Sequence, residues 1–194
     1  LLPEALMAVL LVVLALGVPA LTFLALTLAS VVILIAFGAA RGTGQWDAAG
    51  LVYASLSGFA LAYIRGADHA GFLAILFLFA VVWTTDTLAY FVGRAVGGPK
   101  LAPAISPGKT WSGAIGGTVA GVVAGVLVAT LAGTGNQGLA GLAALLLSIV
   151  SQIGDLFESM IKRHAGVKDS GNLIPGHGGL LDRIDGVVAA LPVF

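Results

Sequence analysis

Long apolar segments constrain the fold of this chain more than any other feature. A helix needs roughly 20 mostly apolar residues to cross a bilayer. Six segments approach that length, at about residues 3–17, 19–39, 48–65, 70–93, 112–133 and 137–158. A seventh begins near residue 183 and runs to the end of the sequence. We therefore expect an all-α fold, a polytopic integral membrane bundle of about seven spanning helices.

Composition supports a bilayer setting and excludes several kinds of site. The 194 residues are 59% apolar and 9% charged, whereas soluble domains carry about 25% charged residues. The formal net charge is zero, so nothing attracts the chain to nucleic acid. The absence of cysteine excludes disulfides, cysteine metal sites and thiol nucleophiles. With only three histidines, a zinc site is poorly supported.

The chain is interpreted as one membrane domain, 1–194, with N-terminal helices in 1–93 and catalytic helices in 94–194. It begins at Leu1 without methionine or a basic flank, and it stops inside the apolar run 191–194. We expect a truncated chain that lacks one or more N-terminal helices and the end of its last helix.

Lysine and arginine placement predicts the orientation. If the connections alternate between sides, one side holds only Arg65. The other side holds Arg41, Arg94, Lys100, Lys109, Lys162, Arg163, Lys168 and Arg183. We expect that basic side to be cytoplasmic, with two long loops, 94–111 and 159–182, and the chemistry on it.

Small residues repeat every four positions in the segment 112–133, at Gly113, Gly117, Gly121 and Gly125. They share one helix face and permit close approach of another helix. Tight packing within the bundle is the first interpretation, and a dimer contact is the alternative.

Carboxylates inside the apolar segments need an explanation, because a charge at the bilayer centre costs about 2.5–3.5 kcal/mol even on the mildest scale. Ser151, Asp155, Glu158 and Lys162 fall on one helical stripe. An i, i+4 pair explains Glu158 and Lys162, but not Asp155, a turn deeper. Asp86 either pairs with an arginine of a neighbouring helix or serves binding or metal support.

The segment 168–185 adds further charges. Asp182 and Asp185 share a face, and Asp155 and Asp182 meet if the last helix packs beside the end of 137–158. A divalent cation relieves such repulsion, and magnesium takes one or two carboxylates plus substrate phosphates. Glycines 176, 178 and 179 permit an anion-binding backbone. His177 either donates to phosphate or bonds to backbone. Positive charge comes from Lys162, Arg163, Lys168 and Arg183.

The loop 94–111 contains Lys100 and the run "SPGKT", with Ser106, Lys109 and Thr110 just before a helix N-terminus, which favours anions. It lacks the spacing of a phosphate loop. Together with the loop 159–182, we expect it to form a second wall of one pocket.

These motifs resemble one known family. "SMIKRHAGVKDSGNLIPGHGGLLDRID", 159–185, is similar to the signature of the phosphatidate cytidylyltransferases, or CDP-diacylglycerol synthases. "WTTDTLAYFVGR", "ISPGKTW" and "QIGDLFES" resemble further segments of that family, and together they cover roughly 83 to 194.

The resemblance implies that CTP and phosphatidate give CDP-diacylglycerol and pyrophosphate, in phospholipid biosynthesis. It implies a magnesium-dependent integral membrane enzyme, with room for a second cation, in a family whose members can be homodimers. Asp155 and Asp182 would hold the metal, with Asp86, Glu158 and Asp185 as supporting carboxylates. Phosphates would be held by Lys109, Lys162, Arg163, Lys168 and Arg183. His177, Gly178 and Gly179 would shape the loop.

Two other functions fit part of the pattern. A CTP-dependent lipid-alcohol kinase would share CTP, magnesium and the membrane, but would release CDP. An ion-coupled transporter would explain intramembrane aspartates, although most charges here lie in the loops. We expect the bacterial inner membrane, with the active site facing the cytoplasm.

Overall fold

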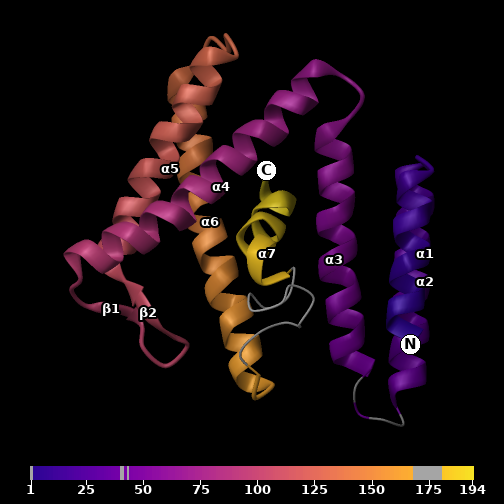
Figure 1. Cartoon of the computed structure of the whole chain (residues 1–194). Coiled ribbons are helices and arrows are strands. Elements are labelled where there is room, and N and C mark those ends of the chain that lie inside the picture. Colours follow the sequence, from indigo (N-terminus) through magenta and orange to yellow (C-terminus); the bar gives the residue numbers. More distant parts are fainter. Residues whose placement is uncertain (1, 40–41, 43, 168–180) are drawn as a thin grey trace. The chain divides into compact units, whose positions relative to one another are not determined.

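A computed structural model of the chain describes residues 2–39, 42, 44–167 and 181–194, except for the side chains of 181–184. Five of its helices are long and apolar enough to cross a membrane, and a shorter apolar helix precedes them. The all-α membrane fold predicted from the sequence is confirmed. The helices are α1 Leu2–Ala15, α2 Ala20–Gly38, α3 Gly44–Arg65, α4 His69–Val96, α5 Trp111–Leu131, α6 Gln137–His164 and α7 Leu181–Ala190, followed by the short 3-10 helix η2 Leu191–Val193 (Figure 1).

The chain divides into two compact units, Leu1–Gly66 and Ala67–Phe194. The first contains α1, α2 and α3. Gly17 adopts φ 67°, a conformation that favours glycine, and lets α1 turn into α2. Phe23 stacks on Phe59 at 5.4 Å between ring centroids. The core of this unit is formed by Leu10, Phe23, Leu34, Ala48 and Leu51.

The second unit contains every charged position singled out above as a candidate site residue. Its helices begin at side chains that accept hydrogen bonds from the otherwise unpaired first-turn amides. Asp68 caps α4 through Gly71 N, Thr110 caps α5 and Asn136 caps α6. The division by function into 1–93 and 94–194 stays a prediction.

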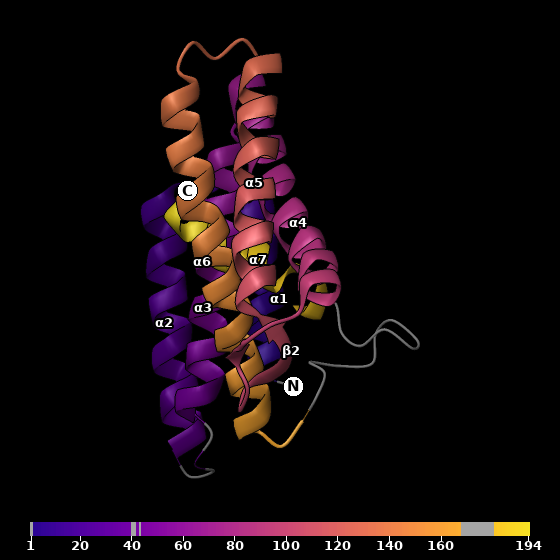
Figure 2. The ribbon, with the colours of Figure 1, turned by 90° about the vertical axis from the view of Figure 1, so that its left-hand side faces the viewer.

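The glycine face of α5 packs against α4. A methyl group added at Gly117 would lie 2.5 Å from the Thr85 carbonyl oxygen, and one added at Gly121 would collide with the Thr85 hydroxyl. All four glycines of the stripe are buried. The first interpretation, tight packing within the bundle, is therefore confirmed. Figure 2 shows α5 running beside α6, with α4 on its other side.

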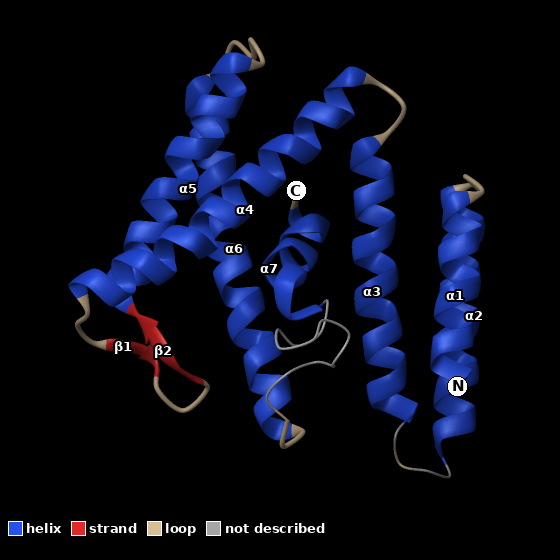
Figure 3. Ribbon diagram, viewed as in Figure 1, coloured by secondary structure: helices blue, strands red, loops and turns tan. Residues whose placement is uncertain are grey.

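The segment 94–111, predicted as an irregular loop, contains regular structure. Helix α4 continues to Val96, and strands β1 Lys100–Ala102 and β2 Ser106–Thr110 then form an antiparallel hairpin (Figure 3). The Ile105 amide donates to the Ala102 carbonyl oxygen at 3.1 Å and closes a turn, and Pro103 has the fixed φ that suits its second position. The strands are short and poor in β-branched residues, so periodicity did not reveal them.

The predicted loop 159–182 is also shorter than expected. Helix α6 continues to His164, and α7 begins at Leu181. Packing of the last helix beside α6 is confirmed, because a methyl group added at Gly154 of α6 would collide with Ala189 of α7. The same added methyl group would lie 3.8 Å from the Asp185 carbonyl oxygen. This contact therefore brings the start of α7 toward Asp155, the neighbour of Gly154.

Candidate active site

A cavity of about 670 Å³ opens in the second unit. Its walls come from the C-terminal half of α4, the β1–β2 hairpin, the start of α5 and the middle of α6. Polar and charged lining residues are Asp86, Tyr90, Arg94, Lys100, Ser106, Lys109, Thr110, Gln152 and Asp155. Glycines 93, 97, 98, 108 and 113 supply much of the remaining wall. The first of the two loops predicted to form one pocket, 94–111, lines this cavity, whereas none of the described residues of 159–182 does. That the two loops form walls of one pocket therefore stays a prediction.

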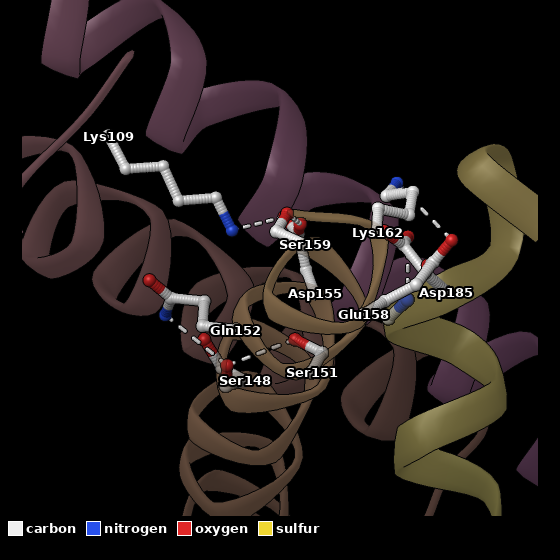
Figure 4. A network of polar contacts seen from close by, with 10 residues as sticks. Lys109, Ser148, Ser151, Gln152, Asp155, Glu158, Ser159, Lys162 and Asp185 are labelled. Atoms are coloured by element: carbon white, nitrogen blue, oxygen red, sulfur yellow. Dashed lines mark hydrogen bonds and ion pairs between the residues drawn. The ribbon is translucent and has the colours of Figure 1, made fainter. Parts of the chain in front are cut away.

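Lys109 on β2 forms an ion pair with Asp155 on α6 (Figure 4). Both side chains are about one quarter exposed, at 27% each. Ser159, one turn further along α6, donates to the other Asp155 oxygen at 3.4 Å. The deepest carboxylate of the predicted stripe thus faces a lysine from a distant segment, at the cavity wall.

Asp86 lines the same cavity from α4. Its carboxylate repels that of Asp155 and is attracted by Lys109. Within the described side chains Asp86 has neither a hydrogen bond nor an ion pair, and no arginine there meets it. The arginine-pair interpretation receives no support from this part of the chain.

Glu158 and Lys162 form the predicted i, i+4 ion pair at 3.3 Å, and Glu158 is 8% exposed. Neither residue lines the cavity. Asp185 on α7 lies near them, where its carboxylate repels those of Asp155 and Glu158, as Figure 4 shows. Three carboxylates therefore converge where α6 meets α7, with one lysine beside them.

Arg163 lies away from these carboxylates. Its Nε donates to the Ile105 carbonyl oxygen at 3.4 Å. This bond links the end of α6 to the turn of the hairpin. In the structure Arg163 thus supports the position of β2, which carries Lys109.

The remaining predicted residues fall outside what the structure describes. Lys168, His177, Gly178 and Gly179 lie in 168–180. Asp182 and Arg183 belong to the first turn of α7, but their side chains are outside the described part.

The described residues offer oxygen donors to magnesium at the cavity. Among them, no group of three histidine, cysteine, aspartate or glutamate side chains is arranged to hold a metal ion. Asp155 and Asp86 face one cavity and repel each other. Magnesium usually takes one or two carboxylates and completes its shell with water and substrate phosphates. The oxygen donors present fit such a partly open site.

Two polar residues of the cavity wall, Arg94 and Gln152, escaped the sequence-based selection of site residues. Arg94 Nη1 donates to Tyr90 Oη at 2.8 Å. Gln152 precedes Asp155 by three positions, so helical spacing alone places the two on one face. That spacing could have revealed Gln152. A glutamine, however, costs less free energy in an apolar helix than a carboxylate does, so it is a weaker indication of a site.

Comparison with known proteins gives a consistent result. Residues 2–194 match the model of the family described as "Cytidylyltransferase family". A phosphatidate cytidylyltransferase of Brucella abortus is 60% identical over 146 residues, which are 75% of this chain and 54% of that protein. The phosphatidate cytidylyltransferase of Haemophilus influenzae is 47% identical over 131 residues, 65% of this chain and 46% of that protein.

The likeness extends to a more distant bacterium. The phosphatidate cytidylyltransferase of Bacillus subtilis is 43% identical over 132 residues, 66% of this chain and 48% of that protein. The chain spans about half the length of the curated relatives it matches.

Proposed function

The chain belongs to the cytidylyltransferase family, and we propose that it carries the part of a phosphatidate cytidylyltransferase that transfers the cytidylyl group of CTP to phosphatidate. The observation that carries this proposal is the Lys109–Asp155 pair in the wall of a cavity of about 670 Å³. It joins a cation and a carboxylate from two motifs that resemble those of the enzyme. The products are CDP-diacylglycerol and pyrophosphate.

The reaction needs positioning more than covalent help from the protein. An oxygen of the lipid phosphate attacks the α-phosphorus of CTP, and the bond from that phosphorus to the β-phosphate bridging oxygen breaks in line. We assign Lys109 to a phosphate oxygen of the triphosphate. We assign Lys162, Arg163, Lys168 and Arg183 to the phosphates and the pyrophosphate, and His177, Gly178 and Gly179 to the loop around them.

Asp155 and Asp182 are proposed to hold magnesium, with room for a second cation. Asp86, Glu158 and Asp185 support them by their negative charge. When bound, the cation neutralises charge on the phosphoryl oxygens and orients the leaving pyrophosphate. Because Lys109 contacts Asp155 directly, the same carboxylate positions the lysine against the triphosphate.

The long apolar helices make the chain an integral membrane protein. We propose that it lies in the bacterial inner membrane with the cavity facing the cytoplasm, because the hairpin and the end of α6 carry the basic residues that the positive-inside rule places there. A site beside such a surface meets both a lipid headgroup and a soluble nucleotide. A homodimer stays a prediction from the family resemblance.

The test is pyrophosphate release from CTP by the full-length protein in detergent. Phosphatidate and magnesium should both be required, and Asp182→Asn should abolish release. Measuring CDP in the same samples distinguishes the lipid-alcohol kinase, which would form CDP without pyrophosphate. A folded full-length protein that releases no pyrophosphate would contradict the proposal.

A further inference from the structure

The amide of Gln152 is held in one orientation at the cavity wall. Its nitrogen donates to Thr118 Oγ1 at 2.9 Å and to the Ser148 carbonyl oxygen at 3.2 Å. A carbonyl oxygen only accepts hydrogen bonds, so the side of the amide that faces Ser148 must be the nitrogen. Both N–H groups are therefore engaged, and Figure 4 shows the amide oxygen pointing away from Ser148.

Buried hydroxyls hold this arrangement from behind. Thr85 of α4 donates to Ser148 Oγ of α6 at 2.9 Å, and Ser148 Oγ lies 3.3 Å from Thr118 Oγ1 of α5. Thr85 and Ser148 are both 0% exposed. The chain of contacts spans three helices, and a satisfied buried network is rigid. Gln152 is thus fixed by side chains that do not themselves line the cavity.

The free end of this network is a hydrogen-bond acceptor. Gln152 lines the cavity together with Asp155, and its Oε1 has no partner among the described residues. Asp155 lies three positions further along the helix, about 4.5 Å along the axis. A fixed amide oxygen this close to the reaction site suits a ligand that offers an N–H or O–H group.

The two proposed substrates differ in that respect. Phosphatidate carries a phosphate and two ester carbonyls, which at neutral pH present almost only acceptors. Cytidine carries the 4-amino group of the base and the ribose hydroxyls, which are donors. An acceptor that faced the lipid would meet other acceptors, so the chemistry of Gln152 matches the nucleotide.

We propose that Gln152 recognises the nucleoside part of CTP by accepting a hydrogen bond from it at Oε1. This inference rests on the proposed function. The triphosphate then extends toward Lys109 and Asp155, while the nucleoside lies on the side of Gln152 and Thr118. The network through Ser148 and Thr85 makes Thr118 a positioning residue, because it orients the amide without touching CTP.

The test compares Gln152→Leu with Gln137→Leu in the full-length protein. Gln137 is the exposed first residue of the same helix, so it controls for the substitution itself. Gln152→Leu should raise the KM for CTP roughly tenfold or more and weaken equilibrium binding of CTP without lipid by a similar factor. The KM for phosphatidate should change less than about twofold.

A second pair of variants keeps the inference testable if Gln152→Leu fails to fold. Thr118→Val removes the oxygen that orients the amide, whereas Thr118→Ser keeps it. Thr118→Val should raise the KM for CTP and Thr118→Ser should restore it, with kcat little changed in both. A purely structural role would instead lower thermal stability in Thr118→Val without a change in the KM for CTP.

Nucleotide analogues identify the donor. If the base donates, wild type should discriminate against UTP and Gln152→Leu should lose that discrimination. If the ribose donates, the same loss should appear with 2′-deoxy- or 3′-deoxy-CTP.

An unchanged KM for CTP in an active, folded Gln152→Leu would overturn this inference while leaving the proposed function intact. So would a rise confined to phosphatidate. No pyrophosphate from the wild type would contradict the proposed function instead.

Discussion

Lys109 and Asp155 are 46 residues apart in the sequence and form an ion pair across the cavity wall. One residue lies on a hairpin strand and the other on a long apolar helix. At 27% exposure each, the pair contributes under about 1 kcal/mol to folding. This small contribution is consistent with the proposed role of the pair in binding and catalysis.

Lys109→Met should separate those roles. We expect the rate of pyrophosphate release to fall about a hundredfold, because a preorganised positive charge at the phosphates is lost. The melting temperature should change little. Lys100→Met, on the other strand of the same hairpin, is the matched comparison and should cost less. Equal losses in both variants would show that hairpin charge in general, rather than the Asp155 pair, matters.

Alanine substitution should have different effects at Gly117, where α5 packs tightly on α4, and at Gly141 of α6, which has space around it. Gly117→Ala places a methyl group 2.5 Å from Thr85 O and 2.7 Å from Ala89 Cβ, and should destabilise by about 1–3 kcal/mol. Gly141→Ala meets only Val126 Cγ2 at an ordinary 3.5 Å and should be neutral or stabilise by about 0.5–1 kcal/mol. Thermal unfolding in detergent measures both, and a stable Gly117→Ala would contradict the packing.

The Glu158–Lys162 pair predicts that stability and activity respond differently to its removal. Lys162→Met leaves a buried carboxylate without its 3.3 Å partner and should destabilise by about 1–3 kcal/mol. The double variant Glu158→Gln with Lys162→Met should recover part of the stability, because the carboxylate that paired with Lys162 is removed together with it. Activity should stay low in the double variant if Lys162 also binds phosphate. Recovery of both would assign Lys162 a structural role only.

Removal of divalent cations should stop pyrophosphate release, and added magnesium should restore it. Asp155→Asn should raise the magnesium concentration needed for half-maximal rate by about tenfold, since one of few carboxylate ligands is lost. Asp68→Asn provides the control. Asp68 caps the N-terminus of α4, away from the cavity, and asparagine caps a helix equally well. An unchanged magnesium requirement in Asp155→Asn would show that residues other than Asp155 hold the cation.

Several features followed directly from the sequence. Apolar length alone predicted the spanning helices, because backbone groups in a bilayer must bond internally. The spacing of Gly113, Gly117 and Gly121 predicted a close helix contact. The i, i+4 spacing of Glu158 and Lys162 predicted their ion pair. Each depends only on the geometry of a single helix.

Tertiary structure decided which distant residues meet. The hairpin depends on a turn at Pro103 and on pairing between short strands with no strong periodicity. The pairing of Lys109 with Asp155, and not with another of the nearby carboxylates, depends on how β2 reaches α6. The orientation of Gln152 is set by Thr118 on α5 and Ser148 on α6. Helical periodicity determines which face a residue occupies, whereas only the packing of α4, α5 and α6 determines what that face contacts.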